Sequence, residues 1–453
     1  MIKVTAIGGY SEVGKNMTLV EIDKDKFIFD AGLYLPPLVE LEETTQQFGE
    51  RKLRQIGALP DDEVLGKVRE KIKAIFVTHA HLDHVGALPY IAHHYKCPII
   101  ATPYTIAILK KLCKDQHTKL KNRLIPLPPN ASLSIKGYKI DFINITHSTL
   151  QTVVIALHTP EGVICYANDF KLDNSPVLGK KPNWDKLKEI AAKGVKCLIV
   201  ESLYAAEERK TPSERIARDL LEDVLLTVNN EGSGIVVTTF SSHLARLKSI
   251  VQIAKKLDRQ IMFVGRSLHK YVSAATELKL INFQKDIELH TYREEVNRAL
   301  KKVQKNKQDW LVVCTGHQGE PNSVLDRIAK DMLPLKLSKD DHLIFSSKII
   351  PSPINQANRK QLEKRFKERG VRIFTDVHVS GHAGREDLRD FIKLLQPETI
   401  IPAHGDMQKL SSLAELAIEL GYQLGKDVFL LQDQQHVWIK SVSYTHLTLP
   451  TKA

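Results

Sequence analysis

The sequence predicts an α/β protein built from more than one domain. Short apolar strands, each bounded by Gly, Pro, Asn or Asp, dominate residues 1–203. Between residues 204 and 346, apolar strands alternate with helical segments, which is the pattern of βαβ units in a parallel sheet. Residues 347–440 keep this alternation and carry further histidine motifs. A chain of 453 residues is long enough for two or three domains with cores of their own.

The individual elements follow from apolar periodicity and from the residues that interrupt it. In the first part we expect strands at 3–7, 18–22, 26–30, 74–78, 140–145, 153–158, 162–167 and 197–201. In the second part we expect strands at 235–240, 260–264, 310–314 and 342–346, with helices beginning near residues 243, 268, 292 and 323. The run Thr211-Pro212-Ser213-Glu214 predicts a capping box, with Pro212 at the first position of the following helix.

Composition narrows the class of protein. The net charge is +12, a basic balance that favours polyanionic partners such as nucleic acid. Five cysteines without a CxxC pair argue against a disulfide framework and against a thiolate zinc site. No apolar run approaches the roughly 20 residues that span a bilayer, and the N-terminus lacks the layout of a signal peptide. We therefore expect a cytoplasmic protein with no membrane segment.

The last thirteen residues, 441–453, fit none of the preceding patterns. They follow an expected strand at 436–440 and resemble translated adapter sequence. We predict that they are a non-native tail, and His446 within them is not counted among the functional residues.

The strongest chemical signal is the run Thr78–Gly86, which follows an apolar strand. Zinc prefers imidazole nitrogen and carboxylate oxygen. His79 and His81 lie two apart in an extended segment, so they can point to the same side and share one metal. Asp83 and His84 lie at the turn into a helix and can face a second metal nearby. Surface histidines on a turn are the ordinary alternative, but four ligand-type residues within six positions make it improbable.

A site for two metals needs more ligands, including a bridging carboxylate. His147, Asp169 and His404 each follow an expected strand, where loop residues can converge. Taken singly each is a weak signal, because a lone histidine is more often hydrogen-bonded in the core and an Asp after a strand is more often a turn residue. Asp30 and Glu201 end strands and could orient ligand histidines, although a turn acid is an equally good interpretation.

These motifs together resemble a known family. Asp30, HAHLDH (79–84), His147 and Asp169 occur in the order found in the metallo-β-lactamase superfamily. Glu201, His382 in HVSGHA and His404 in PAHG resemble the three added motifs of β-CASP nucleases. The runs GGYSEVGKNM, HVSGHA and TGHQGEP are similar to ribonuclease J in its shorter, archaeal form. The resemblance covers residues 1–440. It implies an αββα metallo-β-lactamase sandwich (1–203 and 347–440) with an inserted Rossmann-like β-CASP domain (204–346).

The resemblance also implies roles for individual residues and a cofactor of two zinc ions per chain, with manganese or magnesium as possible substitutes. One zinc would be held by His79, His81 and His147. The other would be held by Asp83, His84 and His404, with Asp169 bridging the two. His382 would donate a proton to the leaving group, supported by Glu201 and Asp30. The candidate catalytic residues are therefore His382, Asp83 and Glu201.

Candidate phosphate-binding residues lie in three loops. The loop His378, Val379, Ser380, Gly381 and His382 combines a glycine, which exposes backbone N–H groups, with a serine hydroxyl. Ser241-Ser242 and Arg266-Ser267 lie where strands of the second part run into helices, and helix N-termini favour anions. Simple helix capping explains the last two pairs nearly as well.

The predicted function is zinc-dependent hydrolysis of RNA. The resemblance implies a 5′-to-3′ exonuclease that favours 5′-monophosphate ends, together with endonuclease activity. His404 favours RNA over DNA, by analogy with relatives of each kind. Three alternatives remain open: an endoribonuclease of the cleavage-factor type, a small-molecule hydrolase of the thioesterase kind, and a non-catalytic RNA-binding protein. A homodimer and partnership with other RNA-decay factors are also left open.

Overall fold

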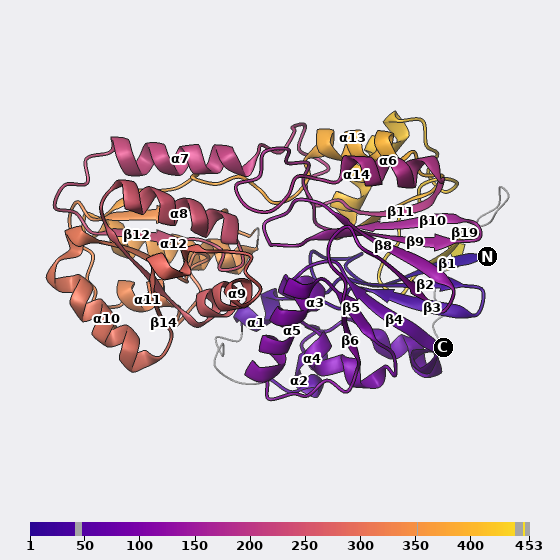
Figure 1. The fold of residues 1–453 in the computed structure, drawn as a ribbon, viewed down its shortest axis with the longest axis horizontal. Helices are drawn as coiled ribbons and strands as arrows, with labels where there is room; N and C mark the ends of the chain where they lie inside the picture. The colour runs from indigo at the N-terminus through magenta and orange to yellow at the C-terminus, as the bar shows by residue number, and fades with distance from the viewer. Residues whose placement is uncertain (41–47, 351, 440–446, 449–453) are drawn as a thin grey trace.

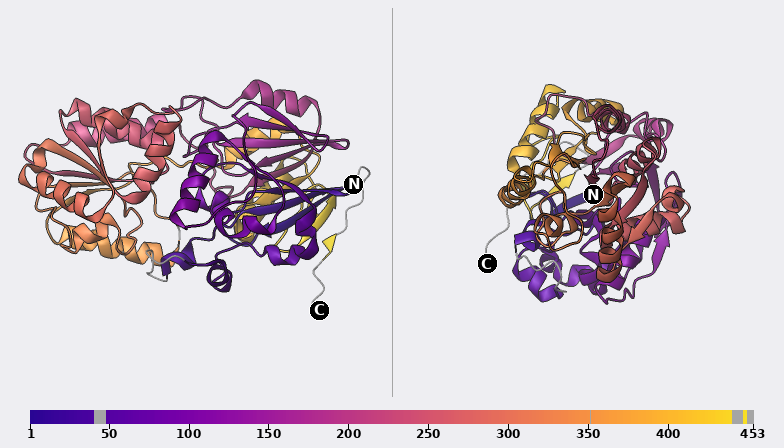
Figure 2. Two further views of the ribbon diagram at one scale, coloured as in Figure 1. Left: turned by 60° about the horizontal axis from the view of Figure 1, so that its bottom comes forward. Right: turned by 90° about the vertical axis from the view of Figure 1, so that its left-hand side faces the viewer.

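The computed structural model describes residues 1–40, 48–350, 352–439 and 447–448. The chain forms two bodies side by side, one containing the first and the last described residues and the other formed by a middle segment (Figures 1 and 2). They touch along α5 (Pro103–Asp115) of the first body and α9 (Arg266–Glu277) of the second. There the Tyr104 hydroxyl donates to the Tyr271 carbonyl at 3.4 Å, and Lys111 pairs with Glu277 at 2.7 Å.

Two sheets pack face to face in the first body. The first has the order β20-β19-β1-β2-β3-β4-β5-β6. Its strands are β1 (Ile2–Gly8), β2 (Met17–Ile22), β3 (Asp25–Phe29), β4 (Ile72–Val77), β5 (Ile99–Ala101), β6 (Leu124–Pro126), β19 (His436–Ile439) and β20 (Leu447–Thr448). The second has the order β18-β11-β10-β9-β8-β7. Its strands are β7 (Ser132–Ile135), β8 (Tyr138–Asn144), β9 (Val153–Thr159), β10 (Gly162–Ala167), β11 (Val195–Glu201) and β18 (Ile400–Ala403).

Helices cover the outer face of each sheet, which makes the body an αββα sandwich. Large apolar side chains of both sheets, among them Phe29, Phe76, Phe142 and Tyr166, fill the space between them. Beside the first sheet lie α1 (Pro36–Glu40), α2 (Glu50–Gln55), α3 (Leu82–Val85), α4 (Leu88–Ile91) and α5. Beside the second sheet lie α6 (Trp184–Ala192), α13 (Arg385–Leu395) and α14 (Met407–Glu419).

The second body is a parallel sheet with helices on both faces. Its strand order is β14-β13-β15-β12-β16-β17, and every pairing is parallel. The strands are β12 (Ile235–Thr238), β13 (Gln260–Val264), β14 (Glu288–His290), β15 (Trp310–Cys314), β16 (His342–Phe345) and β17 (Arg372–Phe374). The helices are α7 (Glu214–Thr227), α8 (Leu244–Lys256), α9, α10 (Arg293–Lys305), α11 (Val324–Ala329) and α12 (Pro353–Lys367).

Two sequence expectations need correction. The inserted domain was expected to end at residue 346, but β17 pairs with β16, so its sheet continues to Phe374. The helix after residue 211 was expected to be capped by Thr211, but α7 starts at Glu214 and its cap is Ser213, whose hydroxyl accepts from the Arg215 N–H at 3.2 Å. Thr211 instead donates its hydroxyl to the His382 carbonyl at 2.7 Å, so tertiary contacts have displaced the local capping motif.

Among the residues that the structure describes, none of the helices is both long and apolar enough to cross a bilayer. The predicted non-native tail lies outside the described residues except for Leu447–Thr448, which form β20 and pair with β19. Its origin stays a prediction.

Candidate metal centre

The predicted ligands meet at one edge of the sandwich because the strands that precede them point the same way. β8 and β10 each run antiparallel to β9, and β11 and β18 run parallel to β10. The carboxyl ends of these four strands therefore lie together, which brings His147, Asp169, Glu201 and His404 to the same edge. From the facing sheet, β4 ends at Val77 and delivers the HAHLDH run to this edge.

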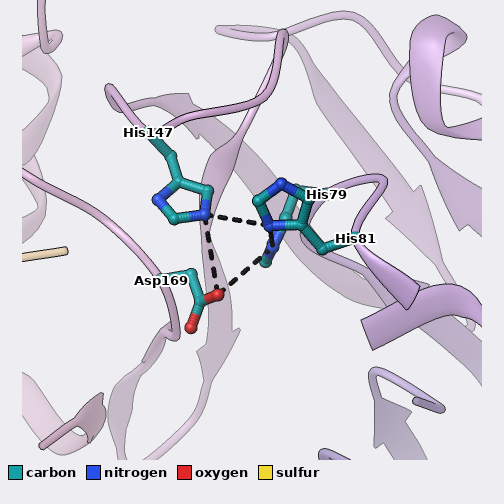
Figure 3. Close-up of side chains that lie close together, drawn as sticks. All are labelled: His79, His81, His147 and Asp169. Atoms are coloured by element: carbon teal, nitrogen blue, oxygen red, sulfur yellow. Dashed lines mark hydrogen bonds and ion pairs between the residues drawn. The ribbon is translucent and has the colours of Figure 1, made fainter. Parts of the chain in front are cut away.

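One group of ligand atoms joins His79, His81, His147 and Asp169 (Figure 3). His81 Nδ1 lies 3.2 Å from His79 Nε2 and 3.1 Å from His147 Nε2. Asp169 Oδ2 lies 3.4 Å from His79 Nε2 and 3.6 Å from His147 Nε2. Ligand atoms bound tetrahedrally to zinc at about 2.0–2.1 Å are separated by about 3.3 Å. The spacing of this group therefore fits a single zinc-sized cation.

A second group shares Asp169 with the first and adds Asp83, His84 and His404. His84 Nε2 lies 3.2 Å from Asp169 Oδ2 and 3.5 Å from Asp83 Oδ2. His404 Nε2 lies 3.5 Å from Asp169 Oδ1. That Oδ1 is buried and accepts no hydrogen bond from the described residues, which is costly for a carboxylate. A cation on this side would give the oxygen the partner it lacks.

The electrostatics of the two groups suit metal binding, which needs ionised carboxylates and neutral imidazoles. Burial raises the pKa of Asp169, but His404 and His84 outweigh it and hold that pKa well below its usual value. Burial and the neighbouring His81 hold the pKa of His147 well below its usual value. Burial also lowers the pKa of His84, but Asp169 and Asp83 raise it well above the usual range. A cation held by those carboxylates would compete with the His84 proton.

Carboxylate and carbonyl groups behind the ligands fix their orientation. Asp30 is fully buried, and its Oδ2 accepts from His84 Nδ1 at 2.8 Å, which turns His84 Nε2 towards the centre, where it lies 3.1 Å from Asn16 Nδ2. The same carboxylate accepts from the Thr78 N–H at 2.8 Å, which ties the start of the HAHLDH loop to β3. The Gly381 carbonyl accepts from His147 Nδ1 at 2.7 Å. Asp30 thus lies where a supporting residue was expected.

Asn16 is a supporting residue that sequence reasoning did not identify. Its Oδ1 accepts from His404 Nδ1 at 2.9 Å, and its Nδ2 donates to the Asp83 carbonyl at 3.0 Å. Asn16 is 1% exposed and directly precedes β2, and its one amide joins the segments of Asp83 and His404, which lie 321 residues apart in the sequence. The only available signal was a polar residue next to an apolar strand inside GGYSEVGKNM.

Glu201, which is buried, and His382, whose side chain is 19% exposed, form a pair beside the ligands. Glu201 Oε2 lies 2.7 Å from His382 Nδ1, and Glu201 Oε1 accepts from the Phe170 N–H at 2.6 Å. The His382 ring lies 4.9 Å from the ring of His147. Burial lowers the pKa of His382, but Glu201 and Asp169 outweigh it and raise the pKa to about 9. Glu201 therefore favours the protonated ring of His382, which is adjacent to the centre.

The candidate phosphate-binding residues surround the same place. In loop 378–382, the Ser380 hydroxyl accepts from the His382 N–H at 3.1 Å, and Val379 is buried. A side chain at Gly381 would collide with Ser148 and His147, so this glycine permits the loop to touch the centre. The residues from the inserted body are Ser241, Ser242, Arg266 and Ser267.

Ser242 is the residue through which the inserted body contacts a predicted metal ligand. Its hydroxyl lies 3.1 Å from His81 Nε2. The hydroxyls of Ser241 and Ser267 lie 2.9 Å apart, so the two strand-to-helix junctions adjoin. Arg266 is exposed at the first position of α9. The structure therefore brings all three predicted loops to one side of the molecule, although which of them touch phosphate stays a prediction.

A further group of ligand-type atoms, in Glu50, His93 and His94, lies apart from this centre. Glu50 already pairs with the Arg54 guanidinium at 2.7 Å and with His94 at 2.8 Å. The arginine charge opposes a cation there, so we interpret this group as an ion-pair cluster.

Comparison with known proteins shows to which family the chain belongs. Residues 10–220 match the model of the metallo-β-lactamase superfamily, and residues 232–362 match the β-CASP domain of ribonuclease J. Residues 367–431 match the RNA specificity domain of Zn-dependent metallo-hydrolases. Ribonuclease J of Methanocaldococcus jannaschii is 43% identical over 96% of this chain and 98% of that protein. The chain belongs to the ribonuclease J family.

Other family members give the same assignment. Ribonuclease J of Pyrococcus abyssi is 42% identical over 95% of each chain. That of Helicobacter pylori is 29% identical over 96% of this chain and 60% of that protein. A crystal structure of an Enterococcus faecalis protein of unknown function has the same fold, with a TM-score of 0.65, 17% sequence identity and coverage of 98% of this chain and all of the other.

These findings confirm the predicted family and fold class: a metallo-β-lactamase domain with a β-CASP insertion. The metallo-β-lactamase fold implies use of divalent metal, and the two ligand groups fit that use. The sheet of the inserted domain continues to Phe374, and the remaining domain boundaries and the roles of single residues stay predictions.

Proposed function

We propose that this protein is a metal-dependent ribonuclease that degrades RNA from 5′-monophosphate ends in the 5′-to-3′ direction. The observation that carries the proposal is the pair of ligand groups that share the buried Asp169 at the junction with a ribonuclease J-type β-CASP domain. The names of the relatives and the match to an RNA specificity domain support RNA as the substrate. The net charge of +12 suits a polyanionic substrate as well.

Two zinc ions fit the centre best. His79, His81 and His147 would hold one of them, and Asp83, His84 and His404 the other, with Asp169 between them. Oxygen-preferring cations such as manganese and magnesium would find fewer suitable ligands, because imidazoles make up three of the four ligands in the first group and two of the four in the second. Bound there, the cations supply a water molecule that is activated at neutral pH and positive charge for the phosphate oxygens.

His382 supplies the proton that the leaving ribose oxygen needs. Its Nδ1 is held by Glu201, which leaves Nε2 as the atom that can give a proton to substrate. A negative carboxylate behind the ring stabilises the charged imidazolium. Glu201 itself is fully buried and touches the backbone next to Asp169, so it fixes the distance between the proton donor and the bridging carboxylate.

Loop 378–382 and the serines of the inserted body would bind the RNA backbone. Ser242, Ser148 and the loop lie around His81 and His147, where a phosphate next to the metals would be. A terminal phosphate held at a fixed distance from the centre would make cleavage start at the 5′ end. We place the protein in the cytoplasm, where RNA decay takes place.

Gel analysis of RNA labelled at either end tests this proposal. A 5′-to-3′ exonuclease releases the 5′ label as a mononucleotide at once, whereas a 3′ label stays on shortening fragments. Ladders of internal products from both labels would instead indicate an endonuclease of the cleavage-factor type. His81→Ala should abolish either pattern, and residual cleavage by that variant at wild-type rates would refute the metal centre as the active site.

The 5′-phosphate preference needs its own measurement. The rate on 5′-monophosphate RNA should exceed the rate on 5′-triphosphate RNA, because a pocket built for one phosphate excludes a longer chain. Equal rates on the two substrates would remove the terminal-phosphate pocket from the proposal but leave ribonuclease activity intact.

A further inference from the structure

Two segments of the chain connect the two bodies, and both pass next to Arg246 in α8. The side chain of Arg246 is fully buried. Its Nε and Nη2 donate to the two carboxylate oxygens of Glu214 at 2.6 and 3.0 Å, where the first connection enters α7. Its Nη1 donates to the Ser346 carbonyl at 2.8 Å and to the Ser346 hydroxyl at 2.7 Å. The same Nη1 lies 3.3 Å from the Val377 carbonyl on the second connection. One guanidinium therefore ties the two connections together.

A series of polar contacts continues from Glu214 into the metallo-β-lactamase domain. The Glu214 N–H donates to Asp173 Oδ2 at 2.8 Å, and Lys171 Nζ lies 3.6 Å from the same oxygen. Lys171 and Asp173 are buried and follow the bridging Asp169 by two and four positions. The positive charges of Arg246 and Lys171 balance the negative charges of Glu214 and Asp173. All four side chains are buried. Because unpaired buried charges are very costly, such a network holds its members in one arrangement.

Arg246 also reaches the first residue of the candidate phosphate loop. Its Nη1 lies 3.4 Å from His378 Nδ1, and Ser346 Oγ donates to the adjacent Val377 carbonyl at 2.8 Å. The two N–H groups of this Nη1 also face the Ser346 oxygens, so His378 is a further neighbour of the same nitrogen. Burial and then Arg246 lower the pKa of His378 to about 2, so the ring stays neutral at physiological pH.

We propose that Arg246 is a positioning residue for RNA cleavage: it clamps both interdomain connections and contacts His378, so that loop 378–382 is held beside the metal centre. The inference rests on the proposed ribonuclease function. Lysine cannot replace this arginine, because an ammonium lacks the planar fork that contacts Glu214 on one side and Ser346 on the other.

Three variants separate the clamp from general stability. Ser346→Ala removes the hydroxyl between Arg246 and Val377 but leaves the ion pair with Glu214 intact. Arg246→Lys keeps the charge and loses the fork. Ser249→Ala is the matched control, because this buried serine lies in the same helix and its hydroxyl donates only to the Ala245 carbonyl, at 3.2 Å, within the helix.

The first readout compares RNA with bis(p-nitrophenyl) phosphate, a small diester that needs the metals and not the loop. We expect kcat/KM on RNA to fall about five-fold in Ser346→Ala, the effect of one hydrogen bond, and further in Arg246→Lys. Zinc content and the rate on the small diester should stay near wild-type values, and Ser249→Ala should match wild type throughout. Equal losses on both substrates, or no loss on RNA in either variant, would overturn the proposal.

Hydrogen exchange provides a readout that needs no activity. The amides of residues 378–384 should exchange faster in Ser346→Ala and Arg246→Lys than in wild type, and Ser249→Ala should leave them unchanged. Unchanged exchange in all three variants would overturn the clamp. A wild-type protein that fails to cut RNA would refute the proposed function, and the exchange measurement would still decide whether Arg246 holds the loop.

Discussion

Replacing Glu201 with glutamine removes the negative charge that faces His382 and leaves the shape of the site almost unchanged. Glu201 is fully buried, with Oε2 2.7 Å from His382 Nδ1 and Oε1 2.6 Å from the Phe170 nitrogen. A glutamine amide can keep one of these contacts through its oxygen. The imidazolium of His382 loses the carboxylate that stabilises it.

The size of the effect follows from the kind of hydrogen bond that is lost. A hydrogen bond to a charged partner contributes about 1.5–3 kcal/mol, roughly twice a neutral one. If that stabilisation serves the proton-donating ring in the transition state, kcat on RNA falls about 10- to 150-fold in Glu201→Gln. Glu201 is outside both ligand groups at the two proposed zinc positions, so we expect zinc content to stay at the wild-type value.

The assay uses two substrates whose leaving groups differ in their need for a proton. RNA releases a ribose oxygen that must be protonated, whereas a p-nitrophenyl ester of a nucleotide releases a stable anion. Glu201→Gln should be slow on RNA and within about three-fold of wild type on the ester. Glu208→Gln, an exposed neighbour, is the control. An unchanged rate on RNA in Glu201→Gln, with zinc retained, would refute the assignment of Glu201 and His382.

Three further predictions follow from the site and its surroundings. Asn16→Ala should weaken zinc binding about 10- to 100-fold in a chelator competition, because His404 loses its hydrogen-bond acceptor; an unchanged affinity would contradict the positioning of His404 by Asn16. Chelation should lower the Tm reversibly, since an ion present at about 100 times its Kd stabilises by about 2.7 kcal/mol; a Tm that is indifferent to EDTA and zinc would argue that the cage does not bind metal. Burial raises the pKa of Glu214, but His243 and Arg246 outweigh it and hold the pKa well below its usual value. The carboxylate therefore contributes stability that is fully present above its unfolded-state pKa and is lost as the pH falls towards its folded-state pKa. The urea midpoints of wild type and Glu214→Gln should converge below about pH 4.5, and a constant difference down to pH 3 would contradict the ion pair.

The structure brings the predicted ligands together because each of them follows a strand that is recognisable in the sequence. HAHLDH comes directly after the apolar strand β4, and His147 and Asp169 follow β8 and β10 by a few residues. Parallel alignment of β8, β10, β11 and β18 then brings distant segments to one edge. The apolar periodicity of the strands and the turn residues that end them are enough to locate such residues in the sequence. They do not show which of these residues lie together in the fold.

Residues that act through tertiary contacts could not be found in this way. Asn16 precedes β2 like many polar residues at strand ends, and its importance depends on His404 being folded next to it. In the sequence, Arg246 resembles an ordinary arginine on the polar face of an amphipathic helix. In the structure, its side chain is fully buried. The capping box at Thr211 failed for the same reason, because a carbonyl from a distant loop competes for its hydroxyl. Local patterns do not record such partners.

The account depends most on two cations being held on either side of Asp169. Anomalous diffraction at the zinc edge, from crystals grown with zinc, tests this directly. We expect two peaks in each chain, one among His79, His81 and His147 and the other between His84 and His404. A single peak, or peaks only elsewhere on the molecule, would contradict the shared bridging carboxylate and the mechanism built on it.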